Sequence, residues 1–323
     1  MPGEPAEPEP PDSGLNALET AREFLKNGAG LAAFSTNLEQ LFHEEVKEDF
    51  PRASTRGHFE VEPYRAHPVA RLRALASPYL APLDALDGVS LGEDHSTTGY
   101  RHEGDLDDVL ADDPDEILIF THGWLARRRA ALGRFPLFAT QAEEFGYEHP
   151  IVGFTWDTSQ GVDRWSSALT IARRNGPKLA QFTYDLKQEH PDMGIRWYSN
   201  SLGPRVLTSA LESLEASGVE DILDSVTVTG AAVDARDATR DGRYGSAIES
   251  VIDGQFHNYW LRHDLTLNTF YRGTAGHTAL GGIGAVGEMP DNYVDHHPDH
   301  VPDHFSYYRY HIGCVDDIVD DFA

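Results

Sequence analysis

The sequence has little cysteine and no long apolar segment. Its one cysteine, Cys314, excludes an internal disulfide framework and a cluster of thiolate metal ligands. No stretch contains the roughly 18 apolar residues that a transmembrane helix needs, so no membrane span is predicted. The first residues, "MPGEPAEPEPPDSG", have neither the basic start nor the apolar centre of a secretory signal. We therefore expect a cytoplasmic protein.

Positive charge is also scarce. The chain has 26 basic residues, of which four are lysines, against 53 acidic residues, and its formal net charge is -27. This balance argues against nucleic acid and anionic membranes as partners. An acidic surface with so little lysine resembles those of proteins that stay soluble in molar salt, where the Debye length is only about 3 Å. The composition therefore predicts a halophilic protein, with an acidic mesophilic protein as the alternative.

The chain divides into three parts by composition. Residues 1–13, rich in proline and glutamate, predict a disordered lead. Residues 14–110 are expected to form an accessory segment, whose start, as far as about Asp49, has the apolar spacing of two helices. Residues 52–110 show no firm pattern. Residues 111–323 are expected to form the core domain, and 323 residues with 40% hydrophobic content suffice for one large domain.

Short apolar runs alternate with helical patterns throughout the expected core. The expected strands are "EILIF" (116–120), "IVGFTW" (151–156), "IRWY" (195–198), "SVTVTGAAV" (225–233) and "FHNYWL" (256–261). The expected helices are "FPLFATQAEEFG", "DRWSSALTIARRNG", "KLAQFTYDLKQEH" and one that carries Val206, Ala210 and Leu214. This order predicts an α/β fold with a doubly wound, mostly parallel sheet.

A cluster of small residues, "SNSLG" (199–203), separates one expected strand from the next helix. A sharp strand-to-helix turn can hold one side chain exposed at the carboxyl edge of the sheet, provided that the residues two before and two after it are small. Ser201 is at the apex of this turn, and Pro204 falls in the first helical turn, where its missing N–H costs nothing. The hydroxyl of Ser201 would lie at the positive end of the helix dipole.

The segments "SNSLGPRV" and "ILIFTHGW", followed by an acid and then a histidine, resemble the α/β-hydrolase superfamily, specifically its lipase- and esterase-like members. The resemblance covers roughly residues 115–312. It implies a serine hydrolase that cleaves an ester or related acyl bond of a small-molecule or lipid-like substrate through an acyl-enzyme, without a cofactor. Two positions depart from the pattern, because Ser199 replaces the usual first glycine and Asn200 a frequent histidine. The alternative is a non-catalytic scaffold of the same fold.

The resemblance also implies a role for individual residues. Ser201 is the nucleophile, and the base is a late histidine, for which His304 in "DHFSYY" fits best and His300 is the alternative. The acid is Asp264, just after the last expected strand, with Asp234 as the alternative. Either acid could instead cap a helix or lie in solvent.

The backbone N–H groups of Leu202 and Trp124 are the expected oxyanion-hole donors, with Leu125 as another candidate for the second. His122 precedes the nucleophile and is not the expected base. Its alternative role is to hydrogen-bond the backbone of a packing turn in which Gly123 has a positive φ.

The segment "DHHPDH" (295–300) holds imidazoles and carboxylates that are plausible zinc ligands. It lacks the spacing of a helical zinc motif, and its prolines predict a loop. We therefore predict a solvated Asp- and His-rich loop, and no metal site.

Overall fold

The computed structural model describes residues 46–61, 88–124, 126, 128–158 and 165–322. The expected disordered lead and almost all of the two expected N-terminal helices lie outside these residues. Among the described residues, no helix combines the length and the apolar character that crossing a membrane requires.

The core is an eight-stranded sheet in the order β10-β9-β8-β7-β5-β6-β1-β4. Every neighbouring pair is parallel except β1 and β4, which pair antiparallel at one edge. The predicted α/β fold with a doubly wound, mostly parallel sheet is confirmed. The strands are β1 (Arg52–Ser54), β4 (Arg101–Glu103), β5 (Glu116–Thr121), β6 (Ile151–Thr155), β7 (Gly194–Asn200), β8 (Leu223–Thr229), β9 (Ile252–Tyr259) and β10 (Tyr293–His296).

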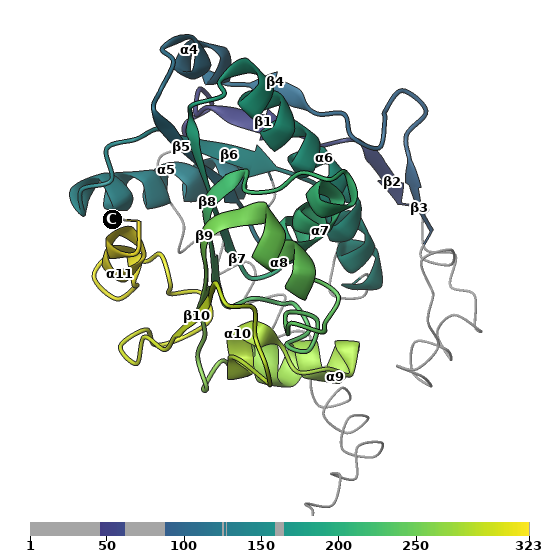
Figure 1. Cartoon of the computed structure of the whole chain (residues 1–323), viewed down its shortest axis with the longest axis vertical. Helices are drawn as coiled ribbons and strands as arrows, with labels where there is room; N and C mark the ends of the chain where they lie inside the picture. The colour runs from purple at the N-terminus through teal and green to yellow at the C-terminus, as the bar shows by residue number, and fades with distance from the viewer. Residues whose placement is uncertain (1–45, 62–87, 125, 127, 159–164, 323) are drawn as a thin grey trace, which may run out of the picture.

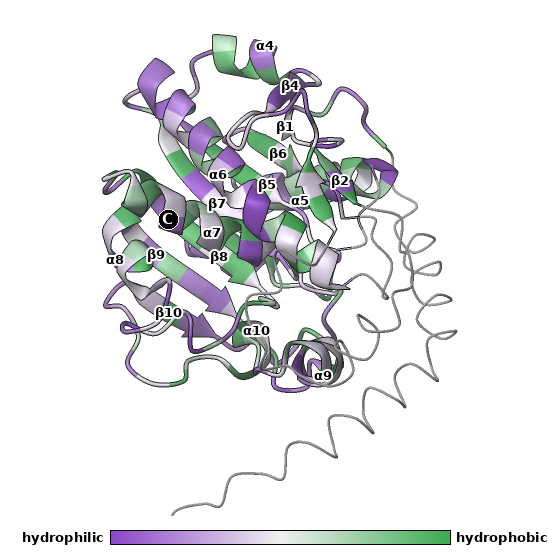
Figure 2. Ribbon diagram, turned by 90° about the vertical axis from the view of Figure 1, so that its right-hand side faces the viewer, coloured by the Kyte–Doolittle hydropathy of each residue, from purple (hydrophilic) through white to green (hydrophobic). Residues whose placement is uncertain are grey.

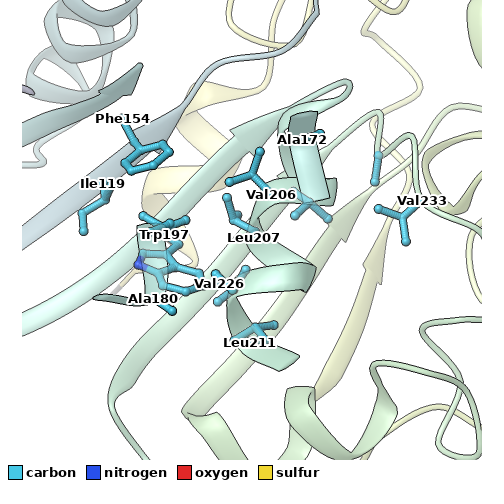
Figure 3. Close-up of a cluster of buried hydrophobic side chains, with 14 of the residues drawn as sticks. Ile119, Phe154, Ala172, Ala180, Trp197, Val206, Leu207, Leu211, Val226 and Val233 are labelled. Atoms are coloured by element: carbon cyan, nitrogen blue, oxygen red, sulfur yellow. The ribbon is translucent and has the colours of Figure 1, made fainter. Parts of the chain in front are cut away.

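Helices cover both faces of this sheet (Figure 1). One face packs against α5 (Arg128–Glu144) and α11 (Val315–Asp320), and the other against α6 (Trp165–Glu189), α7 (Gly203–Ala216) and α8 (Gly245–Val251). Alternate residues of each buried strand point to opposite faces. The larger cluster, on the α6–α7–α8 face, includes Ile119, Trp197 and Val226 beside Val206 and Leu211 of α7 (Figure 3).

Shorter elements complete the described fold. They are the two-stranded sheet of β2 (Phe59–Val61) and β3 (Val89–Leu91), the helix α4 (Leu106–Ala111), the π-helix η3 (Thr266–Tyr271), α9 (Arg272–Ala275) and α10 (Leu280–Ile283).

The sheet begins earlier in the chain than the expected boundary at residue 111. Both β1 and β4 belong to the main sheet, because Arg52 pairs with Gly153 on one side and with Glu103 on the other. The side chain of Arg52 is 3% exposed and lies 3.0 Å from the carboxylate of Glu103. A partly buried ion pair thus joins these two strands, which lack the apolar runs of the central strands.

One long helix, α6, replaces the two helices expected from "DRWSSALTIARRNG" and "KLAQFTYDLKQEH". Pro177 lies inside it and cannot donate a hydrogen bond to the carbonyl of Arg173, four residues earlier. The hydroxyl of Ser209 on α7 donates to that carbonyl instead, at 3.0 Å. Gly176 allows this approach, since a Cβ there would lie 2.5 Å from the Cβ of Ser209.

The strand expected over 225–233 is shorter than predicted. β8 ends at Thr229, and Gly230 has φ +52°, in the left-handed region that glycine adopts without strain. The chain therefore leaves the sheet four residues earlier than expected.

Candidate active site

Ser201 lies between β7 and α7 with φ +62°. A positive φ is strained for a residue with a side chain, so the surrounding structure must hold it. Two hydrogen bonds do so: the N–H of Ser201 donates to the carbonyl of Thr229 at 3.0 Å, and its own carbonyl accepts from the N–H of Ala232 at 2.8 Å. The end of the neighbouring strand β8 thus fixes the turn that presents the Ser201 hydroxyl.

Small residues flank this turn because the helix and the strand pass at close range. A Cβ on Gly203 would lie 2.0 Å from Ser199 Oγ and 2.6 Å from the carbonyl of Thr121. Ser199, where the family pattern has glycine, donates its hydroxyl to that same carbonyl at 2.7 Å. Asn200 points its amide at Thr229, 3.1 Å from Oγ1. Both departures from the family pattern are therefore accommodated by hydrogen bonds.

The structure brings Ser201, His304 and Asp264 together. His304 Nδ1 lies 2.6 Å from Asp264 Oδ2, and His304 Nε2 lies 2.9 Å from Ser201 Oγ. Because a carboxylate only accepts hydrogen bonds, Nδ1 carries the proton and Nε2 is left to accept the Ser201 hydroxyl. His304 is 2% exposed and Asp264 is fully buried. The low-polarity surroundings strengthen both interactions.

Asp264 uses its two oxygens differently. Oδ2 faces His304, while Oδ1 accepts the N–H of Leu267 at 2.9 Å, next to the start of η3. The two roles considered for this residue, capping a helical turn and facing the histidine, therefore coexist. The backbone contact also fixes which oxygen faces the imidazole.

The alternative residues have other partners. Asp234 accepts the N–H of Arg236 at 3.0 Å and lies 3.2 Å from His277 Nδ1. His300 is exposed and donates from Nε2 to the carbonyl of Gly313 at 2.9 Å.

The turn after β5 passes directly over Ser201. A Cβ on Gly123 would lie 2.8 Å from both the Asn200 carbonyl and Ser201 Cβ, so close approach requires glycine here. Gly123 does not have the positive φ that the packing-turn interpretation expected. The approach brings the Gly123–Trp124 turn against Ser201. Leu202 opens α7 from the other side and is fully buried. Leu125 lies outside the described residues.

His122 anchors this turn. Burial, and then the charge of Arg56, hold the pKa of His122 well below its ordinary value, so the ring is neutral. Its Nδ1 donates to the carbonyl of Gly123 at 3.0 Å, and its Nε2 accepts from Arg56 Nη2 at 3.2 Å and from the N–H of Trp156 at 3.3 Å. The indole of Trp156 is fully buried and donates to the carbonyl of His122 at 3.1 Å.

Two further residues shape the site and were missed from the sequence. Arg56 follows β1 and reaches both His122 and the carbonyl of Ala126, at 2.9 Å from the latter. Gly230 leaves room for the imidazole, since a Cβ there would lie 3.1 Å from His304 Nδ1. A glycine directly after the strand beside β7 was a signal for Gly230. No sequence pattern links Arg56 to the turn.

The residues of "DHHPDH" do not form one cluster of ligands in the structure. Asp295 accepts from the N–H of Ala285 at 2.7 Å, His297 lies 2.9 Å from Asp299, and His300 bonds the backbone. His296 faces away from this loop, toward Asp321 at 3.2 Å.

The comparisons with known proteins leave the activity open. Residues 159–316 match a family described as "Protein of unknown function (DUF726)". No curated protein matches the sequence. One similar solved structure is described as "A novel cutinase-like protein from Cryptococcus sp."; it is 12% identical, with a TM-score of 0.32, over 64% of this chain and 90% of that one.

Proposed function

We propose that the protein is a serine hydrolase that cleaves an ester or related acyl bond through an acyl-enzyme. The observation that carries the proposal is the chain of contacts from Asp264 Oδ2 through His304 to Ser201 Oγ, at 2.6 and 2.9 Å, on a turn held at φ +62°. Hydroxyl, imidazole and buried carboxylate in this order form the unit that activates serine for acyl transfer.

In the proposed reaction, Ser201 Oγ attacks the acyl carbon while His304 Nε2 takes the hydroxyl proton. His304 then gives that proton to the leaving oxygen, and the acyl group stays on Ser201. In deacylation a water molecule attacks the acyl carbon and gives a proton to His304, which returns it to Ser201 Oγ. Asp264 orients the imidazole and stabilises its protonated form. No step needs a cofactor.

The N–H groups of Leu202 and Trp124 are proposed to stabilise the oxyanion. Leu202 follows the nucleophile at the start of α7, where the helix dipole also favours negative charge. Trp124 follows Gly123, whose contact with Ser201 brings this turn to the nucleophile.

Reaction with a fluorophosphonate probe tests the proposal. We expect the native protein to incorporate one phosphonyl group, located by mass spectrometry on Ser201, and Ser201→Ala to incorporate none. Ser213→Ala, which removes another serine hydroxyl on α7, should label like the native protein. A folded protein that stays unmodified would support the non-catalytic scaffold instead.

We also propose that the acidic surface adapts the protein to high salt. The start of α11 illustrates the repulsion: partial desolvation, and then the charge of Asp316, raise the pKa of the exposed Asp317. Raising the salt concentration screens such contacts, and at about 0.5 M the Debye length is about 4 Å.

We expect the melting temperature and the activity to fall below roughly 0.5 M salt, because the unscreened carboxylates repel one another. Thermal unfolding in 0.1 M and in 3 M KCl measures the effect. Equal melting temperatures in the two KCl concentrations would contradict the halophilic interpretation.

A further inference from the structure

Three potential metal-ligating atoms from distant parts of the sequence meet where β9 and β10 end. His257 Nδ1 lies 2.9 Å from His296 Nε2, and Asp321 Oδ2 lies 3.2 Å from each of these nitrogens. His257 is on β9, His296 is the last residue of β10, and Asp321 directly follows α11. This group is separate from the Ser201–His304–Asp264 contacts.

The sheet register places the two histidines on one face. His257 is opposite Val294, and His296 is opposite Tyr259, so His257 and His296 are diagonal neighbours with the same orientation. That face is the one covered by α5 and α11, since Tyr259 packs in their cluster. Figure 2 shows hydrophilic colours along the later parts of both strands. The carboxylate of Asp321 completes the group from the α11 side.

With Asp321 as a carboxylate and both imidazoles neutral, the contacts within this group cannot all be favourable without a cation. A single hydrogen can bridge two ring nitrogens at 2.9 Å, and the accepting nitrogen then turns a lone pair toward Asp321 Oδ2 at 3.2 Å. If both nitrogens carry hydrogens, the two N–H groups oppose each other. A repulsive contact is costly where water is largely excluded: His257 is 4% exposed, while His296 and Asp321 are partly buried. A cation removes the conflict because it attracts all three atoms.

The spacing fits a tetrahedral ion. Ligands about 2.1 Å from a tetrahedral zinc ion are separated by about 3.4 Å, and the three observed separations are within about half an ångström of this value. A point roughly 2 Å from all three atoms lies about 1 Å above their plane, which leaves a fourth position for water. Two imidazoles and a carboxylate are a ligand set that suits zinc.

We propose that His257, His296 and Asp321 form a structural zinc site that joins the end of α11 to β9 and β10. Tyr259 supports it, because its hydroxyl donates to Asp321 Oδ2 at 2.5 Å and orients the carboxylate. The two strands continue into the segments that carry Asp264 and His304. Zinc here stabilises the frame of the sheet edge, and the serine chemistry proposed above does not pass through it.

Zinc titration of the chelator-treated, full-length protein tests the site. Isothermal titration calorimetry should show one zinc ion per chain, with a rise in melting temperature of roughly 5 °C at about 100 times the Kd. Cobalt in place of zinc should give the visible absorption of a four-coordinate ion. His296→Ala and Asp321→Asn should each abolish the one-to-one binding and the cobalt spectrum.

The matched control is His300→Ala, since His300 lies with Asp316 and Asp317 in an exposed second group of potential ligands. This variant should bind zinc as the native protein does. The cobalt spectrum reports the ligands of the bound ion, and far-UV circular dichroism reports the secondary structure. Together they distinguish a variant that has lost only the metal site from one that no longer folds. Absence of stoichiometric binding to the native protein, or binding that survives both His296→Ala and Asp321→Asn, would overturn the proposal. At temperatures where the zinc-free protein stays folded, it should still react with the fluorophosphonate. A negative result for the zinc site therefore leaves the proposed serine hydrolase function untouched, and the reverse also holds.

Discussion

Replacing Ser201 or His304 by alanine is expected to reduce the kcat for a short p-nitrophenyl ester by about 10⁴- to 10⁶-fold, and replacing both should cost little more. The reason is that neither group can complete the reaction alone. Without the imidazole the hydroxyl has no acceptor for its proton, and without the hydroxyl the imidazole has no nucleophile to activate. Measured kcat values for the two single variants and the double variant form a cycle that tests this coupling.

The cycle needs a control for the loss of an imidazole from this region. His300→Ala removes a histidine that lies four residues before His304 in the sequence. His300 is exposed and donates to the carbonyl of Gly313. This variant should keep its kcat. Losses that multiply in the double variant, or a His304→Ala protein with near-native turnover, would contradict a unit made of these two residues.

Much of the fold could be predicted from local sequence, because its central strands are buried on both faces. "EILIF" and "IVGFTW" are continuous apolar runs, and both form strands within a residue of the expected bounds. The strands β1 and β4, at one end of the sheet, could not be found in this way. They are three residues long and mostly polar, and the Arg52–Glu103 pair that joins them links residues far apart in the sequence.

Two errors within the core concern where a helix and a strand end. Gly176 and Pro177 have the local properties of a helix end, but α6 continues through them, and the hydroxyl of Ser209 on the next helix donates to the carbonyl that Pro177 leaves without an N–H. The apolar residues after Gly230 extend the pattern of a strand, although the turn at this glycine has already ended it. In α6 the tertiary structure overrides the local preference, whereas at Gly230 the local preference of glycine itself ends the strand.

The candidate site was predictable where its residues follow strands in a known order. Ser201, Asp264 and His304 were chosen from such positions, and the structure places their polar atoms in contact. Their catalytic roles remain predictions. The support around them, such as the contact of Arg56 with His122, depends on chain segments brought together only by folding. The same is true of the convergence of His257, His296 and Asp321.

Replacing Asp264 by asparagine is expected to reduce kcat/KM by three to four orders of magnitude, about the loss typical of this change in a Ser-His-Asp unit. The structure gives the reason. The N–H of Leu267 donates to Oδ1, so in the variant it holds the amide oxygen in that position and the NH₂ group takes the place of Oδ2. That NH₂ group then donates to His304 Nδ1, which moves the ring proton to Nε2. With Nε2 protonated, His304 cannot accept the proton of Ser201.

Asp234→Asn is the matched control, because it makes the same chemical change in the acid that was the alternative. Its carboxylate, 15% exposed, faces His277 and the N–H of Arg236 and not His304, so we expect kcat/KM to stay within about twofold of native. The ¹⁵N chemical shifts of His304 report which ring nitrogen carries the proton, and they should change in Asp264→Asn alone. If Asp234→Asn shows the large loss while Asp264→Asn does not, the acid is Asp234 and the contact at 2.6 Å only positions the ring.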